Sequence, residues 1–99
     1  MTSKPFLSII TTTYQSEEYI KELIKEIYKD IVNKFPQKTE VIVYDGGSQD
    51  ITQTILKKLH KKHPFRLEIS PKRDRYTSSV KKLYQMASGQ LIFYLDSDG

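Results

Sequence analysis

The sequence contains no cysteine and no tryptophan, and it has only four glycines and four prolines. Without cysteine the chain can form neither a disulfide scaffold nor a thiolate metal site. Its longest apolar run is residues 91–95, and residues 1–5 are short and polar, so we expect neither a membrane span nor a signal peptide. The expected location is the cytoplasm, either free or peripheral at the inner face of the membrane.

The composition is that of a soluble globular chain, with 37% hydrophobic and 28% charged residues. Ninety-nine residues are enough for one small domain, which we expect to span residues 1–99. The net charge of +4 favours an anionic binding partner. The lysines between positions 57 and 62 lack interleaved aromatic residues, which favours a solvated helix face and argues against a nucleic-acid partner. Arg73 and Arg75 follow a predicted strand and could reach a phosphate.

Apolar periodicity predicts four strands that alternate with three helices. The strands are expected over residues 7–14, 41–44, 65–70 and 91–95, and the helices over residues 16–35, 51–63 and 78–88. Alternating units of about thirty residues are typical of an α/β fold, here a three-layer, doubly wound sheet of four mainly parallel strands in the order 3-2-1-4. The third strand alternates apolar and polar residues and should lie at an edge, whereas the fourth reads as fully buried.

The helix ends carry their own signals. Ser16 is a good N-cap for the first helix, whose apolar stripe runs from Ile20 to Phe35. His60 and His63 could share a metal, but their place near a helix C-terminus favours a capping role. On the third helix Val80, Leu83, Tyr84 and Ala87 should face the core, and Gly89 should terminate the helix.

In a doubly wound sheet the loops after the strands meet at one rim, where ligands bind. These loops carry Thr13 and Tyr14, Asp45 to Ser48, Arg73 to Arg75, and Asp96 to Asp98. The predicted strand order would place Tyr14 beside Asp96 at the point where the order reverses. Function is therefore expected at this rim.

Asp96 and Asp98 follow the fourth strand with one residue between them. Acids at i and i+2 on an extended backbone point the same way, so both could face one divalent cation together with substrate phosphates. The alternative is an Asp-Ser-Asp-Gly turn that binds no metal. The sequence lacks the glycine fingerprints of dinucleotide sites and P-loops, which leaves a Mg²⁺ or Mn²⁺ site that holds a diphosphate as the better interpretation.

Three segments resemble, in order and spacing, the N-terminal half of family 2 glycosyltransferases with the GT-A fold. They are residues 7–14, 41–50 and 87–98. The resemblance implies an enzyme that transfers a sugar from a nucleotide-diphospho-sugar, with UDP as the family's default nucleotide, to a glycan or lipid-linked acceptor. Inversion at the anomeric carbon is expected at the level of the family.

The resemblance also implies roles for individual residues. Thr13 and Tyr14 would line the nucleotide pocket, Asp45 would hydrogen-bond the base, and Arg73 or Arg75 would approach the nucleotide. Asp96 and Asp98 would bind Mn²⁺ or Mg²⁺, with Asp98 as the direct ligand of a cation that stabilises charge on the leaving nucleoside diphosphate.

Some positions depart from the family pattern. Thr12 to Gln15 replace Pro-Thr-Tyr-Asn, Gly46 replaces a second acid, and Lys81 replaces an asparagine of the donor site. The family's acceptor-binding half and catalytic base follow the metal motif, so we expect this chain to be an inactive fragment with no catalytic residue of its own. Its fourth strand would then have an open apolar edge through which it self-associates.

Other classes of protein remain as alternatives. A nucleotidyltransferase or phosphotransferase would also use acids and a cation, but it would show a glycine-rich loop or an acid pair after the first strand. A non-catalytic nucleotide-binding or response-regulator-like module would place acids after the first strand, where Thr13 stands. A basic nucleic-acid-binding domain is disfavoured by the helical placement of the lysines.

Overall fold

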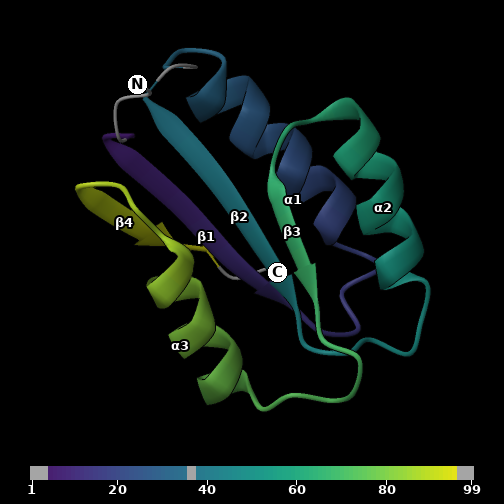
Figure 1. The fold of residues 1–99 in the computed structure, drawn as a ribbon. Coiled ribbons are helices and arrows are strands. Elements are labelled where there is room, and N and C mark those ends of the chain that lie inside the picture. Colours follow the sequence, from purple (N-terminus) through teal and green to yellow (C-terminus); the bar gives the residue numbers. More distant parts are fainter. Residues whose placement is uncertain (1–4, 36–37, 96–99) are drawn as a thin grey trace.

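The protein is described here by a computed structural model over residues 5–35 and 38–95. Its elements, in order along the chain, are β1 (Leu7–Thr13), α1 (Ile20–Ile27), η1 (Tyr28–Val32), β2 (Thr39–Asp45), α2 (Thr52–Lys62), β3 (Arg66–Ile69), α3 (Tyr76–Met86) and β4 (Leu91–Tyr94). The strands form one sheet in the order β3-β2-β1-β4, and all three pairings are parallel (Figure 1). The predicted α/β class and strand order are confirmed.

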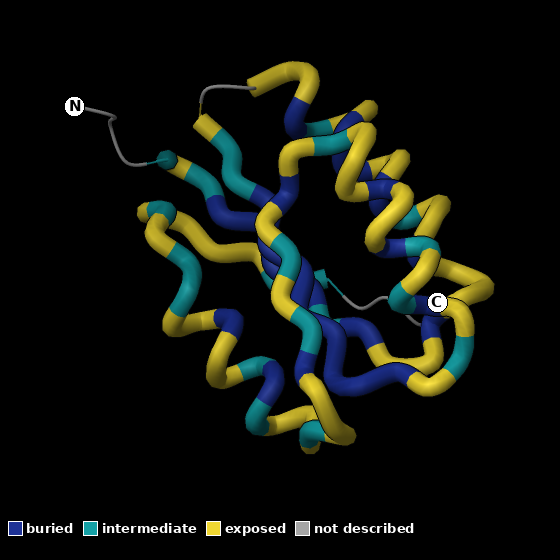
Figure 2. Tube along the Cα trace, turned by 45° about the vertical axis from the view of Figure 1, so that its right-hand side comes forward, coloured by how far each residue is buried: buried dark blue, intermediate teal, exposed yellow. Residues whose placement is uncertain are grey.

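Helices cover both faces of the sheet, with α1 and α2 on one face and α3 on the other (Figure 1). Because side chains alternate along a strand, Ile9 and Val43 join the core under α1 and α2, whereas Ile10 and Ile42 join the core under α3. In Figure 2 the buried stretches gather in the central strands and on the inner sides of the helices. The sheet is therefore the middle layer of three.

The first helix differs from the prediction at both ends. It is α-helical only from Ile20 and passes into η1, a π-helical turn in which the Asn33 amide donates to the Tyr28 carbonyl over 2.9 Å. Tyr19, the residue directly before the helix, makes no side-chain capping hydrogen bond. The predicted cap, Ser16, lies further upstream, and its hydroxyl bonds to the backbone of Tyr14. Phe35 is 55% exposed, so the apolar stripe ends before it.

Helix α3 begins two residues earlier than predicted and is rotated slightly from the expected face. Tyr84 is 48% exposed, while Ser79 is buried with Leu83. Gly89 does not end the helix in a left-handed conformation. A Cβ at this position would lie 2.6 Å from Ser8 Oγ and 2.7 Å from Ser8 N, so glycine is required for a close approach to β1.

The two outer strands differ from each other in exposure. Strand β3 alternates between exposed and half-buried residues, which confirms the predicted edge strand. The prediction that β4 is fully buried is wrong, because in the described chain β4 pairs only with β1 and Leu91, Ile92 and Phe93 are 48%, 36% and 53% exposed. Self-association through this strand stays a prediction. None of the helices in the described residues is long and apolar enough to cross a bilayer.

Candidate functional site

The carboxyl ends of the parallel strands lie along one rim of the sheet, where β1 ends at Thr13 and β2 ends at Asp45 (Figure 1). Asp96 and Asp98, the predicted metal ligands, lie outside the described residues. The chain leads to them through Leu95, whose amide donates to the Ile10 carbonyl over 2.9 Å and whose carbonyl accepts from Thr11 Oγ1 over 2.5 Å. The last described residue before the acid pair is thus held beside β1.

Thr13 and Asp45 are brought together, as the predicted strand order requires. Both side chains are buried, and Thr13 Oγ1 donates to Asp45 Oδ1 over 2.7 Å. The remaining acceptor capacity of Asp45 is taken by its own loop, since the Gly47 and Ser48 amides donate to Oδ2 over 3.1 and 2.8 Å and the Ser48 hydroxyl donates to Oδ1 over 2.6 Å. Asp45 therefore holds the loop after β2 in shape.

This network bears on the role that the resemblance implied for Asp45. The residue is 0% exposed, and both of its carboxylate oxygens already accept hydrogen bonds. In this structure Asp45 holds the loop after β2 in place. Its contact with a base, which the resemblance implies, stays a prediction.

Gln15 joins the loops after β1 and β2, a role that sequence reasoning missed. Its backbone has a φ of 52°, in the left-handed region. Its side-chain Oε1 accepts hydrogen bonds from the Gln49 and Asp50 amides, over 2.6 and 3.1 Å, and its own amide donates to Ser48 Oγ over 2.9 Å. No local sequence pattern signals such a contact, because the partners lie more than thirty positions away.

Asp50 helps to begin α2, as one of the two caps proposed for that helix. The Thr52 amide donates to Asp50 Oδ1 over 2.9 Å, whereas the other proposed cap, Ser48, is directed toward Asp45. Thr52 Oγ1 in turn accepts from the Ser16 amide over 2.9 Å. The start of α2 is therefore fixed against the loop after β1.

Tyr14 and Arg73, both predicted to meet the nucleotide, are in direct contact. The Arg73 guanidinium lies over the Tyr14 ring, with its central carbon 3.9 Å from the ring centroid. Both residues are exposed, and no carboxylate lies within 4.0 Å of the Arg73 guanidinium in the described chain. Together they form a cationic, aromatic surface at the rim. Arg75 lies at the start of α3, and its side chain makes no hydrogen bond or ion pair with the described residues.

A second cluster next to Arg73 was not predicted. Asp74 Oδ2 accepts from the Tyr44 hydroxyl and from Lys82 Nζ, each over 2.8 Å, and Lys82 Nζ also lies 3.0 Å from the Tyr44 hydroxyl. The hydrogen bonds from Lys82 and then Tyr44 hold the pKa of the Asp74 carboxyl below its usual range. The same contact with Asp74 raises the pKa of Lys82. Both groups are therefore charged at neutral pH.

The loops after β2 and β3 pack tightly against each other. The Ser70 amide donates to the Asp45 carbonyl and the Asp74 amide donates to the Gly46 carbonyl, both over 2.9 Å. Gly47 has a φ of +88°, and a Cβ on it would lie 2.5 Å from the Lys72 carbonyl oxygen. The position of Arg73 is thus set by the backbone of two interlocked loops.

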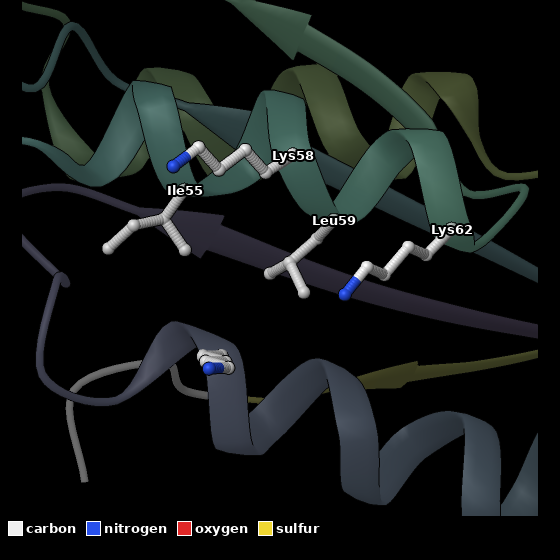
Figure 3. Close-up of a pocket in the computed structure, with 5 residues that line it drawn as sticks. Ile55, Lys58, Leu59 and Lys62 are labelled. Atoms are coloured by element: carbon white, nitrogen blue, oxygen red, sulfur yellow. The ribbon is translucent and has the colours of Figure 1, made fainter.

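Away from the rim, α1 and α2 enclose a groove of about 320 Å³ (Figure 3). Ile55 and Leu59 form its apolar part, and Lys21, Lys58 and Lys62 also line it. The lining holds no acid, histidine, serine or threonine. None of the predicted site residues lies in it.

The histidines take part in aromatic contacts. The His63 ring stacks on Tyr28 with the centroids 4.4 Å apart, and the His60 ring is tilted against Phe65 at 5.2 Å. No group of three histidine, aspartate or glutamate residues that could hold a metal ion occurs in the part of the chain that the structure describes. The predicted metal ligands, Asp96 and Asp98, lie outside that part, so the cation site stays a prediction.

The comparisons with known proteins agree on one family. The family model described as Glycosyl transferase family 2 matches residues 8–99. The chain is 33% identical over 95 residues to the poly(ribitol-phosphate) beta-N-acetylglucosaminyltransferase TarS of Staphylococcus aureus, a match that covers 92% of this chain and 16% of TarS. The chain therefore corresponds to a small part of that enzyme.

Solved structures show the same fold. The mannosyltransferase PcManGT from Pyrobaculum calidifontis, in complex with GDP-Man and Mn²⁺, superposes with a TM-score of 0.81 at 25% identity, over 98% of this chain and 28% of that one. S. aureus TarS 1–349, in complex with UDP, superposes with a TM-score of 0.77 at 29% identity, over 97% of this chain and 28% of that one. The sequence match and the shared GT-A fold together show that the chain belongs to glycosyl transferase family 2.

Proposed function

We propose that this chain is the donor-binding part of a glycosyltransferase that transfers a sugar from a nucleoside-diphosphate sugar to a glycan or lipid-linked acceptor. The family supports sugar transfer, and the relatives solved with GDP-Man and with UDP support a nucleotide donor. UDP is the proposed nucleotide. The cytoplasmic location, free or at the inner face of the membrane, belongs to the same proposal.

One observation carries the proposal, namely the contact between Arg73 and Tyr14 at the rim. An aromatic ring offers a stacking surface to a base, and a guanidinium that pairs with no acid of the described chain offers paired N–H donors to a diphosphate. Thr13 and Asp45, buried at the ends of β1 and β2, join the starts of the two loops that follow these strands. The rim therefore presents groups for both ends of a nucleoside diphosphate.

A divalent cation fits the donor set of the neighbouring segment. Asp96 and Asp98 supply carboxylate oxygens, which Mg²⁺ and Mn²⁺ prefer, and a relative is solved with Mn²⁺. When bound, such a cation neutralises charge on the leaving nucleoside diphosphate. The residues of this chain then bind and orient the donor. Because the chain spans only 16% to 28% of these relatives, we expect it to bind a donor without completing the transfer.

Thermal unfolding of this chain with UDP, GDP and CDP, each with and without Mn²⁺, tests the proposal. A ligand at a hundred times its dissociation constant adds about 2.7 kcal/mol, which should raise the midpoint by on the order of 10 °C for a small domain. We expect the shift for one nucleotide, with Mn²⁺ present, and its loss in Asp98→Asn.

The matched control is Asp30→Asn, which removes an exposed acid on η1 and should leave the shift unchanged. A shift that persists in Asp98→Asn would contradict the metal site. No shift with any of the three nucleotides would contradict donor binding by this chain. A metal-dependent nucleotidyltransferase, the second candidate, would instead respond to a nucleoside triphosphate more strongly than to the diphosphate.

A further inference from the structure

We infer that Lys82 sequesters the Asp74 carboxylate, and that this keeps Arg73 free to bind the diphosphate of a nucleotide donor. The inference rests on the proposed function, since it assigns a positioning role within the same rim. Lys82 and Asp74 would not touch the nucleotide. Their effect would be to decide whether the neighbouring arginine is available.

The carboxylate of Asp74 bonds to groups other than the guanidinium groups of the two arginines that flank it in the sequence. Its Oδ2 accepts from Lys82 Nζ and from the Tyr44 hydroxyl, each over 2.8 Å, and its Oδ1 accepts from the Arg75 backbone amide over 3.1 Å. The side chain is only 18% exposed. An acid that stands between two arginines in the sequence is thus paired with neither guanidinium.

Arg73 is consequently left without a counter-charge in the described chain. Its one recorded side-chain contact is the face of its guanidinium on the Tyr14 ring, at 3.9 Å. A stacked guanidinium keeps its N–H donors directed outward in its own plane, which is the geometry for paired hydrogen bonds to phosphate oxygens. Tyr14 therefore holds the Arg73 side chain in place, while its N–H donors pair with no acid of the described chain.

Lys82 is what maintains this arrangement. It lies on α3, eight residues after Asp74, and its ammonium also lies 5.3 Å from the centroid of the Tyr44 ring. If the ammonium were removed, the carboxylate would lose its cationic partner, and the arginines on either side of it in the sequence could pair with it. An acid paired with Arg73 would compete directly with a phosphate for the same N–H donors.

A double-mutant cycle separates this role from simple loss of positive charge. We would measure the affinity for UDP with Mn²⁺ by titration calorimetry in the wild type, Lys82→Met, Asp74→Asn and the double variant. Lys82→Met should weaken binding about tenfold, within the range found for coupled neighbours. In the Asp74→Asn background the same change should alter binding by about twofold or less, because no free acid is left to compete.

A second measurement does not depend on nucleotide binding. The side-chain protons of Arg73 lie over the Tyr14 ring and should be shifted upfield in the NMR spectrum by its ring current. We expect this shift to be lost in Lys82→Met and retained in Asp74→Asn and in the double variant. If no nucleotide binds the wild type, the proposed function fails, while this spectrum still decides whether Lys82 controls Arg73.

Two controls complete the design. Lys61→Met removes one exposed lysine from α2, on the opposite face of the sheet, and should change neither readout. Lys82→Arg keeps the cation and should preserve both readouts, which guards against a variant that merely folds poorly. Equal losses of affinity from Lys82→Met in both backgrounds, or unchanged Arg73 signals in Lys82→Met, would overturn the inference.

Discussion

The Thr13 hydroxyl, at the end of β1, donates a buried hydrogen bond of 2.7 Å to the Asp45 carboxylate at the end of β2. These two residues lie opposite each other in the parallel pairing of β1 and β2, so the contact lies where both strands end and their loops begin. The rim is therefore supported by polar groups that are buried beneath its surface. Its shape depends on hydrogen bonds that have no access to water.

The first prediction concerns the stability that this network provides. Asp45→Ala would leave the Thr13 hydroxyl and the Gly47 and Ser48 amides without their acceptor in a buried site. We expect the free energy of unfolding to fall by about 3 kcal/mol or more. Urea denaturation would measure the change, with Glu26→Ala, which removes an exposed acid, as the control. A loss below about 1 kcal/mol would contradict the network's importance.

The second prediction compares two adjacent glycines. A Cβ on Gly47 would lie 2.5 Å from the Lys72 carbonyl oxygen, in a backbone with a φ of +88°, whereas a Cβ on Gly46 would have its nearest neighbour at 3.4 Å. Gly47→Ala should therefore destabilise the protein by about 2 kcal/mol or more, and Gly46→Ala by clearly less. Thermal melts of the two variants would test this. Equal losses would show that the loops after β2 and β3 are less tightly packed.

The third prediction concerns acid stability at the opposite end of the sheet. Glu40 accepts hydrogen bonds from the hydroxyl of Ser8, and from the amide and hydroxyl of Ser88 over 2.7 and 3.0 Å. Burial acts to raise the pKa of the Glu40 carboxyl, but the hydrogen bonds from Ser8, Ser88 and Gly89 outweigh it and lower the pKa. The charged form is therefore favoured by folding.

The sign of the pH dependence follows from that lowered pKa. The contribution of Glu40 to stability is present above its unfolded pKa of about 4.3 and is lost as the pH falls through the lower folded value. Glu40→Gln should then be less stable than the wild type at pH 7, with the difference shrinking below about pH 4. Urea melts from pH 7 to pH 3 would measure it. A difference that stays constant with pH would contradict the prediction.

The fourth prediction concerns the outer edge of β4. The Leu91 amide donates to the Phe6 carbonyl, directly before β1, and the Leu95 amide donates to the Ile10 carbonyl within β1. Alternation therefore directs the Ile92 amide to the other edge, which pairs with no strand in the described chain. Sedimentation should show that the chain associates as its concentration rises, because an exposed apolar strand edge recruits partners. Ile92→Pro should abolish this by removing the outward donor, while Ile92→Ala should keep part of it. A monomer at high concentration in the wild type would contradict the prediction.

Much of the fold could be predicted because its signals are local. Apolar runs such as Val41 to Tyr44 predicted the strands, and the helical spacing of apolar residues around Ile24 predicted the first helix. The general rules of α/β sheets then predicted the strand order. The errors came from contacts between distant segments. Gly89 was interpreted as a helix terminator, but the structure requires glycine there because Ser8 lies against it. The exposed face of β4 was missed because an apolar run does not reveal what covers it.

The candidate site likewise has a part that the sequence predicts and a part that it does not. The strand order was enough to predict that the loops with Thr13 and Tyr14, with Asp45 and with Arg73 would share a rim, where the structure brings Thr13 to Asp45 and Tyr14 to Arg73. The pairing of Asp74 with Lys82 was not predictable, because Asp74 precedes the helix that carries Lys82 and no helical spacing relates them. The burial of Asp45 depends equally on loops that interlock only in three dimensions.

The strand order β3-β2-β1-β4 also affects how the chain assembles during synthesis. Strand β1 is made first and gains β2 on one side early, but its partner on the other side is β4, the last of the four described strands. At ribosomal rates, the interval from Asp45 to Tyr94 lasts on the order of 2 to 10 s. Throughout that time the edge of β1 that later pairs with β4 stays unpaired on the nascent chain. The yield of folded protein should therefore depend on whether other groups cover this edge until β4 is made.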